Sequence, residues 1–378
     1  MSIAAAFDGA PERGTINFSV GQPSADLLPL RLLAGGNERF FADAAPFDLN
    51  YGQRQGDARF RNALARFLGA AGGTPVDPDS LMLTGGISQA LDFICGRLAR
   101  AGDVAFVEEP SYPYSFQIFR DHGLEVVGIP MDGSGMDLTA FERELAQRKP
   151  KLVYTIPSYH NPTGQVMDRA KRDRLAALSR EHGFVILADE VYQQLYHGDP
   201  PPPSFGTYTA AGNVLSLGTF SKILAPGLRL GWIQASAEPL ETLLASGALV
   251  SGGNFNHFTS HVVRKLMEGG ELAAFVARLR ESYAERAQAM DAALRRHLSN
   301  VARWQKPGGG YFFWLELPEG ANIPALEARA RTAGTGFLPG SFCSMCGGLG
   351  HCMRLSFAHY TVPDIHEGIA RLARAFAP

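Results

Sequence analysis

Seven short apolar runs lie between residues 81 and 235, and most are unbroken rather than alternating with polar residues. Unbroken runs of this length are typical of strands covered on both faces. The segments between them, such as 87–100 and 168–182, suit helices. The pattern predicts an α/β fold whose mostly parallel seven-stranded sheet has helices on both faces. The runs are LMLTGG, VAFVEE, EVVGIPM, LVYTIP, FVILADE, VLSLGTF and RLGWIQA.

The pattern changes after about residue 245. Helical periodicity runs through FVARLRESYAERAQAMDAALRRHL, and the strand-like runs GYFFWLEL and CMRLSFA follow it. We predict a large domain over residues 45–245 and a smaller α+β unit formed by residues 1–44 and 246–378. Residues 1–44 are interrupted by Pro and Gly and have little hydrophobic periodicity, so we expect them to pack against residues 246–378 rather than extend the sheet.

Composition and charge exclude several classes of partner. The 378 residues are 46% hydrophobic and have a formal net charge of −2, without a long basic run. Such a chain can bury a large core, but its charges do not indicate binding to nucleic acid or to an anionic membrane. The first residues have neither a basic start nor a sustained apolar run, so we expect a cytoplasmic protein with reduced thiols. Small molecules are the expected ligands.

Glycines follow the first predicted strand, at the edge where open parallel sheets bind ligands. Gly85 and Gly86 are followed by Ser88 and Gln89, and a sharp turn here would expose the amides of the next helix as an anion seat. A plain strand-to-helix turn explains the glycine pair equally well.

The segment GTFSKILAPGLRLGW, residues 218–232, holds only two charged residues, Lys222 and Arg229. Isolated cations among apolar and small residues usually have an anionic or covalent partner. Arg229 would bind a phosphate together with the hydroxyls of Thr219 and Ser221, which leaves Lys222 beside that phosphate for another role. An ordinary loop lysine is the alternative.

Two further polar residues follow inner strands. Asp189 ends the strand of FVILADEVY, where it would act as a helix cap, form a salt bridge or face a protonated ring nitrogen. Asn161 lies in PSYHNPTG, where the Asn-Pro step forces an extended turn that directs the amide. Because Lys222 also follows an inner strand, we expect all three side chains in one pocket.

The order and spacing of these residues over nearly the whole chain resemble a known enzyme family. The residues that carry the resemblance are NPTG at 161–164, Asp189 with Tyr192, and Ser221-Lys222 with Arg229. They are similar to motifs of the fold-type I, pyridoxal-phosphate-dependent class I/II aminotransferases. The seven-residue gap between Lys222 and Arg229 and the sequence APGLRLGW look closest to the 2-aminoadipate and kynurenine aminotransferase branch, which includes the catalytic-like domains of MocR regulators.

The resemblance implies pyridoxal 5'-phosphate as the cofactor. Lys222 would hold it as a Schiff base and then act as the general base that moves the substrate α-proton. Asp189 would keep the pyridine nitrogen protonated, and Asn161 and Tyr192 would hydrogen-bond the phenolic oxygen. The phosphate ligands would be Gly86, Ser88, Gln89, Thr219, Ser221 and Arg229.

Substrate contacts also follow from the resemblance. Tyr112 would stack on the cofactor ring, with Tyr114 as the nearby alternative. Arg354, in HCMRLSFAH, would bind the substrate α-carboxylate through its bidentate guanidinium, because it matches the family position for that arginine. Gly21 and Asn161 would lie beside the substrate, and glycine permits the backbone to approach closely.

Two segments bear on assembly and on departures from the family. Tyr51, in LNYGQRQG, resembles the tyrosine that reaches the cofactor phosphate of the other subunit, which implies a homodimer with shared sites. The family usually has a proline-rich variant of this segment, so the specificity for the side chain of the substrate is open.

Cys343, Cys346, His351 and Cys352 have nearly metal-like spacing, but they coincide with a family loop that ordinarily binds no metal, so we expect no metal ion there.

The expected function is amino-group transfer between an L-amino acid and a 2-oxo acid. Glutamate and 2-oxoglutarate would be the common pair, with a 2-aminoadipate-, aromatic- or branched-chain-type donor. The alternative is an enzyme of the same fold that diverts the substrate carbanion to elimination, cyclisation or oxidation, because the lysine does not distinguish these reactions. A DNA-binding regulator is not expected, since the family-like pattern starts near residue 15 and leaves little chain for a helix-turn-helix.

Overall fold

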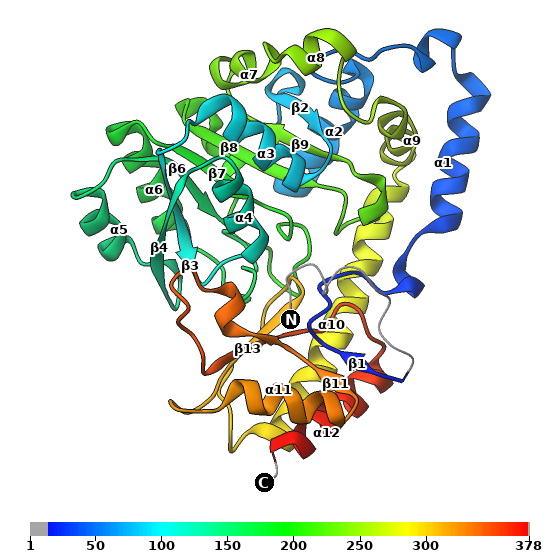
Figure 1. Ribbon diagram of the computed structural model, residues 1–378. Helices are drawn as coiled ribbons and strands as arrows, with labels where there is room; N and C mark the ends of the chain where they lie inside the picture. Colours follow the sequence, from blue (N-terminus) through cyan, green and yellow to red (C-terminus); the bar gives the residue numbers. More distant parts are fainter. Residues whose placement is uncertain (1–13, 377–378) are drawn as a thin grey trace.

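The computed structural model describes residues 14–376 of the chain (Figure 1). Residues 1–13 and 377–378, which belong to the predicted smaller unit, lie outside the described residues. In Figure 1 the large sheet and its helices occupy the upper part of the view, and the C-terminal helix α12 (Val362–Phe376) lies in the lower part. The long helix α10 (Glu271–Leu298) packs against α12.

An eight-stranded sheet has the order β2-β9-β8-β7-β6-β3-β4-β5. Its strands are β2 (Leu81–Thr84), β3 (Val104–Glu109), β4 (Glu125–Asp132), β5 (Gly135–Met136), β6 (Pro150–Thr155), β7 (Val185–Asp189), β8 (Val214–Thr219) and β9 (Gly231–Gln234). Strands β4, β3, β6, β7 and β8 pair in parallel, whereas β9 is antiparallel to β2 and β8. The predicted α/β fold with a mostly parallel sheet is confirmed.

The predicted number of strands was one too few. All seven apolar runs form strands, and the eighth strand is β5, which has two residues and pairs antiparallel with β4. Only Gly133 and Ser134 separate it from β4. A strand this short contains no apolar run, so the periodicity of the sequence could not reveal it.

Both faces of the large sheet are buried. Its helices are α2 (Ala58–Gly72), α3 (Ile87–Leu98), α4 (Pro113–Asp121), α5 (Leu138–Leu145) and α6 (Arg169–His182). Val107 and Tyr154 belong to a core cluster that includes apolar residues of α2, α3 and α4, whereas their neighbours Phe106 and Val153 belong to a second cluster with α5 and α6. Successive strand residues point to opposite faces, so covering both faces requires unbroken apolar runs.

Local signals set the ends of the predicted helices. Asp168 caps α6 by accepting a hydrogen bond from the Lys171 amide at 2.8 Å, and Gly183, with φ of 78°, ends the helix. Helix α6 therefore begins one residue after the predicted start of 168 and ends at the predicted residue 182. Helix α3 ends at Leu98, two residues before the predicted end.

The remaining helices and strands lie outside the large sheet. The helices are α1 (Leu30–Asp43), α7 (Ala237–Leu244), α8 (Gly247–Gly252), α9 (His257–Glu268) and α11 (Ile323–Thr332), and the strands are β1 (Ile16–Asn17), β10 (Phe312–Glu316), β11 (Thr335–Gly336), β12 (Leu338–Pro339) and β13 (Cys352–Ser356). Of these, α7 and α9 pack against α3 and α2, two helices of the large sheet. Strand β13 lies between β10 and β12 in an antiparallel sheet. Within residues 14–376, no helix has both the length and the apolar character needed to cross a bilayer.

The N-terminal segment does not extend the large sheet. Strand β1 pairs in parallel with β11, and α1 packs against α9. In Figure 1 the blue β1 accordingly lies beside the elements of the lower part. Helix α9 also packs against α2 of the large sheet, so the contact of α1 does not separate a smaller unit from the large domain, and the domain division near residue 245 stays a prediction.

Arg172, on α6, is a fully buried cation, which is an uncommon place for a charge. Its guanidinium donates to the carbonyl oxygens of Pro157 and Pro203 at 2.9 Å each, and to Ser158 Oγ at 2.8 Å. These acceptors belong to the loop after β6 and to the proline-rich segment after β7. Arg172 therefore fixes the start of the loop that carries Asn161.

Replacing Arg172 with Met should lower the free energy of unfolding by about 3 kcal/mol or more, because several buried acceptors lose their donor. Urea unfolding followed by circular dichroism measures this change. Arg169 lies on the same helix with an exposed side chain 3.8 Å from Asp173. Arg169→Met is therefore the matched control and should cost less than about 0.5 kcal/mol. Equal losses in both variants would contradict the bracing role of Arg172.

Candidate active site

The topology of the large sheet brings four separate segments to one edge. Strands β6, β7 and β8 are parallel, so their carboxyl ends lie together. Asn161 follows β6, Asp189 ends β7 and Lys222 follows β8. Because β9 is antiparallel to β8, Arg229, two residues before β9, lies at the same edge.

The turn between β2 and α3 has the features of an anion-binding site. The 12-residue helix α3 has no side-chain cap at its N-terminus. Gly86 has φ of 90°, and a Cβ there would lie 3.0 Å from Arg229 Nη2, so the position requires glycine. The same Nη2 donates to the carbonyl oxygen of Gly85 at 3.1 Å. A cation and the amides of a helix N-terminus thus converge, which fits a phosphate group.

The other predicted phosphate ligands have different surroundings. Thr219 is buried, and its hydroxyl lies 3.0 Å from Ser221 Oγ. Ser88 is exposed in the first turn of α3. Gln89 turns back toward the glycine pair, and its Oε1 accepts a hydrogen bond from the Gly85 amide at 2.9 Å. Gln89 therefore supports the turn itself, and Thr219 aligns Ser221.

Lys222 is half-buried at the centre of the site. Its Nζ donates to the carbonyl oxygen of Gly21 at 2.7 Å and lies 5.1 Å from the centre of the Tyr311 ring. Burial and the nearby charge of Arg354 lower the pKa of Lys222 to about 8, whereas Asp189 opposes this shift. An amine with this pKa is unprotonated far more often than an ordinary lysine, as a nucleophile or general base requires.

Asp189 is only 4% exposed, and its contacts are with neutral groups. Tyr154 Oη donates to Asp189 Oδ2 at 2.7 Å, and the Val191 amide donates to Oδ1 at 3.3 Å. Among the residues that the structure describes, Asp189 forms no salt bridge. Burial raises the pKa of Asp189 to about 6, and the hydrogen bond from Tyr154 opposes this. A buried carboxylate that forms no salt bridge is suited to a cationic ligand.

Arg354, 5% exposed on β13, contacts the loop after β6. Its Nη1 donates to Asn161 Oδ1 at 2.9 Å and its Nη2 to the carbonyl oxygen of Ser19 at 2.7 Å, whereas its Nε has no partner among the described residues. The guanidinium carbon lies 4.1 Å from the centre of the Phe312 ring. A Cβ on Gly21 would lie 3.1 Å from that ring. This buried, incompletely paired arginine fits a carboxylate.

The predicted tyrosines divide between the site and the surface. Tyr192 is buried after β7. Tyr112 is half-buried at the N-terminus of α4, and burial, followed by the charge of Asp189, raises its pKa. Tyr114 has its ring centre 5.3 Å from that of Tyr112. Tyr51 is 79% exposed, so it lies on the surface.

Comparison with known proteins decides the family. The sequence matches the family described as aminotransferase class I and II over residues 13–372. The chain belongs to the class I and II aminotransferases.

Individual relatives support this membership. This aminotransferase is 34% identical to the aromatic-amino-acid aminotransferase 1 of Thermococcus litoralis over 95% of this chain and 87% of that protein. It is also 34% identical to the 2-aminoadipate transaminase of Thermus thermophilus over 96% of this chain and 90% of that protein. The crystal structure of LysN, an alpha-aminoadipate aminotransferase from Thermus thermophilus complexed with N-(5'-phosphopyridoxyl)-L-leucine, has a TM-score of 0.87 and 32% identity, covering 98% of this chain and 95% of that one. The predicted fold type I and the class of pyridoxal-phosphate-dependent aminotransferase are confirmed.

Four residues that contact the candidate site residues were not predicted: Ser19, Tyr154, Tyr311 and Phe312. Tyr154 lies in the unbroken run LVYTIP, and Tyr311 and Phe312 lie in GYFFWLEL. Aromatic residues in apolar runs usually fill the core, so the pattern did not separate these from packing residues. The contact of Ser19 is made by its backbone carbonyl, which no side-chain pattern reports.

The cysteine-rich loop is held beside the candidate site. Within residues 14–376, no group of three or more His, Cys, Asp or Glu side chains could hold a metal ion. Cys343 and Cys352 are buried, and Cys346 is exposed. Glu109, at the end of β3, accepts a hydrogen bond from the Met345 amide at 2.8 Å. This bond joins the loop to the large sheet.

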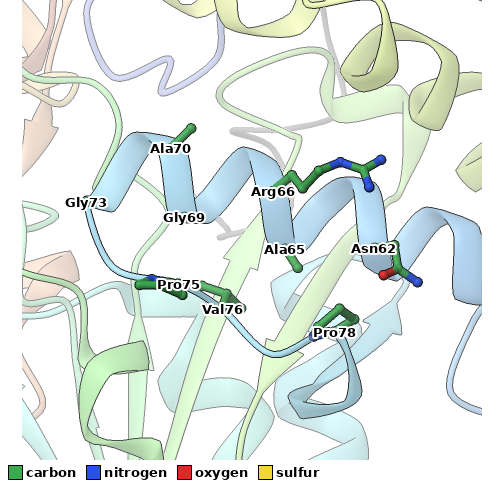
Figure 2. A pocket seen from close by; sticks show the side chains of 9 residues that line it. All are labelled: Asn62, Ala65, Arg66, Gly69, Ala70, Gly73, Pro75, Val76 and Pro78. Carbon is green, nitrogen blue, oxygen red and sulfur yellow. The ribbon is translucent and has the colours of Figure 1, made fainter.

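An open hollow of about 580 Å³ lies between α2 and the chain that follows it (Figure 2). Its lining residues are Asn62, Ala65, Arg66, Gly69, Ala70, Gly73, Pro75, Val76 and Pro78. None of them belongs to the aminotransferase site, and Arg66 supplies the one charged side chain of this lining. We assign the hollow no role in the reaction.

Replacing Lys222 with Met should stabilise the cofactor-free protein at pH 7. The fold lowers the pKa of Lys222 from 10.5 to about 8. Charging this amine in the fold therefore costs free energy below about pH 8, and the cost disappears as the pH rises toward about 10.5. We expect a gain on the order of 1 kcal/mol in urea unfolding at pH 7 that shrinks as the pH increases.

Lys151→Met is the control for this measurement, because Lys151 is exposed on β6. This variant should be as stable as the native protein at every pH. A gain at position 222 that did not depend on pH would point to packing rather than to the lysine charge.

Proposed function

We propose that this aminotransferase moves an amino group between an L-amino acid and a 2-oxo acid, with glutamate and 2-oxoglutarate as the common pair. The observation that carries the proposal is that Asp189 and Lys222 follow the neighbouring parallel strands β7 and β8, while Lys222 Nζ and the Arg354 guanidinium both lie close to Gly21. Pyridoxal 5'-phosphate, when bound, supplies an electron sink for the carbanion of the substrate. The chain itself has to bind, orient and deprotonate the donor.

The residues present fit the phosphate and the ring of this cofactor. The uncapped amides of α3, with Gly86, Ser88, Gln89, Thr219, Ser221 and Arg229, would hold the phosphate. Asp189 would face the ring nitrogen, because a buried carboxylate that forms no salt bridge is stabilised by a protonated nitrogen beside it. Asn161 and Tyr192 would hydrogen-bond the phenolic oxygen, and Tyr112 would cover the ring.

Lys222 would carry the cofactor through Nζ and, once the donor amine displaces it, take the proton from the substrate α-carbon. Its pKa of about 8 supports this role, because a general base works best when its pKa lies near the working pH. The hydrogen bond to Gly21 O shows that Nζ reaches the segment proposed to lie beside the substrate.

Arg354 would bind the α-carboxylate of the donor. Its bonds to Asn161 and to the Ser19 carbonyl fix the plane of the guanidinium, and the Phe312 ring lies under it. A fixed guanidinium loses little conformational freedom when it binds a carboxylate. The relatives named for aromatic amino acids and 2-aminoadipate, and the leucine conjugate in LysN, favour a donor of the 2-aminoadipate, aromatic or branched-chain type.

We further propose a homodimer in which Tyr51 reaches the cofactor phosphate of the partner. Tyr51 is 79% exposed, which is unusual for a large aromatic side chain unless a partner covers it. Other exposed apolar side chains are Leu28, Leu30, Phe41, Phe47, Leu49, Val250 and Phe258. Phe41 and Phe258 have ring centres 6.0 Å apart, so part of this set forms a patch across α1 and α9. The cytoplasmic location stays a prediction.

The purified protein should turn yellow with pyridoxal phosphate, and borohydride should then fix the cofactor to the peptide that contains Lys222. Mass spectrometry locates the adduct. A panel of amino donors with 2-oxoglutarate, measured as glutamate formed, should identify the donor class. Lys222→Ala should reduce turnover by at least about a hundredfold, because it removes the proposed base.

Two outcomes would count against these assignments. An adduct on another lysine would remove Lys222 from its proposed role. If the colour bleached with donors and no glutamate formed, the alternative reaction, in which the carbanion goes to elimination, cyclisation or oxidation, would be favoured.

Shared sites predict complementation between two defective variants. Mixed dimers of Tyr51→Ala and Lys222→Ala should contain one site with both native residues, so a reassembled equal mixture should regain up to about a quarter of the native activity. Each variant refolded alone is the control. Activity no higher than the mean of the two controls would contradict a site shared through Tyr51.

A further inference from the structure

We propose that Tyr154 is a positioning residue for the cofactor, acting through Asp189: its hydroxyl holds one carboxylate oxygen and keeps the other aimed at the ring nitrogen. This inference rests on the proposed function, because it assigns a task to Asp189. Its evidence is the geometry of two neighbouring strands and the burial of both side chains.

Strand register explains why Tyr154 meets Asp189. Strands β6 and β7 are parallel, and Tyr154 lies opposite Leu187. Asp189 is two residues beyond Leu187, so it lies on the same face of the sheet as Tyr154. A long side chain spans this diagonal, and the Tyr154 hydroxyl lies 2.7 Å from Asp189 Oδ2. A phenylalanine would fill the same space without reaching the carboxylate, so the hydroxyl alone makes the contact.

The packing of Tyr154 leaves its hydroxyl little freedom. The side chain is fully buried in the main core cluster, and its ring packs edge-on against Phe119 with centres 5.7 Å apart. Burial, followed by the charge of Asp189, raises the pKa of Tyr154 well above its usual value. The phenol therefore keeps its proton throughout the working pH range and always donates to the carboxylate.

The hydrogen bond also favours the ionised form of Asp189. Burial raises the pKa of Asp189, and among the influences that lower it the Tyr154 hydrogen bond is the largest, followed by the Val191 amide. An ionised Asp189 is the state that pairs with a protonated ring nitrogen. The Tyr154 hydroxyl thus both orients the Asp189 carboxylate and favours its ionised form, while the Tyr154 ring packs in the core.

The experiment compares the affinity for pyridoxal phosphate, measured by absorbance titration, in the native protein and in Tyr154→Phe. Hydrogen bonds to charged groups are strong, so we expect the dissociation constant to rise about tenfold or more. In an Asp189→Asn background the same substitution should change it by less than about threefold, because the charge is gone. A role limited to packing would give equal losses in both backgrounds.

Tyr208→Phe is the matched control. Tyr208 Oη donates to Asp173 Oδ1 at 2.6 Å, so this variant removes the same type of bond at an exposed position of the large domain. It should leave the dissociation constant unchanged. Thermal unfolding of each cofactor-free variant should confirm that the fold is intact.

The pH dependence gives a second readout. Asp189 has a pKa of about 6, so cofactor affinity of the native protein should fall as the pH drops through about 6 and the carboxylate becomes protonated. In Tyr154→Phe the fall should begin at a higher pH, because the charged form has lost its donor. An unchanged profile with unchanged affinity would overturn the role of Tyr154. If the native protein bound no cofactor at all, the proposed function itself would fail instead.

Discussion

The site depends on buried charged side chains whose hydrogen-bond partners are neutral groups. Asp189 accepts from a phenol and an amide, and Arg354 donates to an amide oxygen and a carbonyl. Neutral partners orient these groups without neutralising them, so their charges remain available to a ligand. Arg172 is the contrast, because its guanidinium makes five hydrogen bonds that brace two loops and also lies 4.0 Å from the Glu190 carboxylate, so its charge is not left for a ligand.

The large sheet makes this arrangement tolerable. Its two faces are packed by separate apolar clusters, so the strands are rigid and their ends hold side chains in fixed directions. Segments outside the large sheet then close the site from the other side, since Arg354 comes from β13 and Gly21 from the segment after β1. A large core offsets the free energy lost in keeping Lys222 and Asp189 out of water.

Much of the fold was predictable because its signals are local. Two-sided burial produces unbroken runs, and Asp168 and Gly183 end α6 by hydrogen bonding and by a positive φ. Gln89 illustrates the limit of such signals, because its position beside a glycine turn is evident in the sequence but the direction of its side chain is not. Tyr154 shows the same limit, because the apolar sequence pattern of a buried strand is the same whether the tyrosine hydroxyl forms a functional hydrogen bond or the ring only fills the core.

The sequence by itself determined the succession of the longer strands of the large sheet, the family, and the positions along the chain of the residues predicted for the cofactor and the substrate. Only the tertiary structure decided which of them meet: Lys222 with the Gly21 carbonyl, Arg354 with Asn161, and Tyr154 with Asp189. The physical reason is that spacing along a strand fixes which face a side chain occupies, whereas a contact between distant segments depends on strand register and on how the two layers pack.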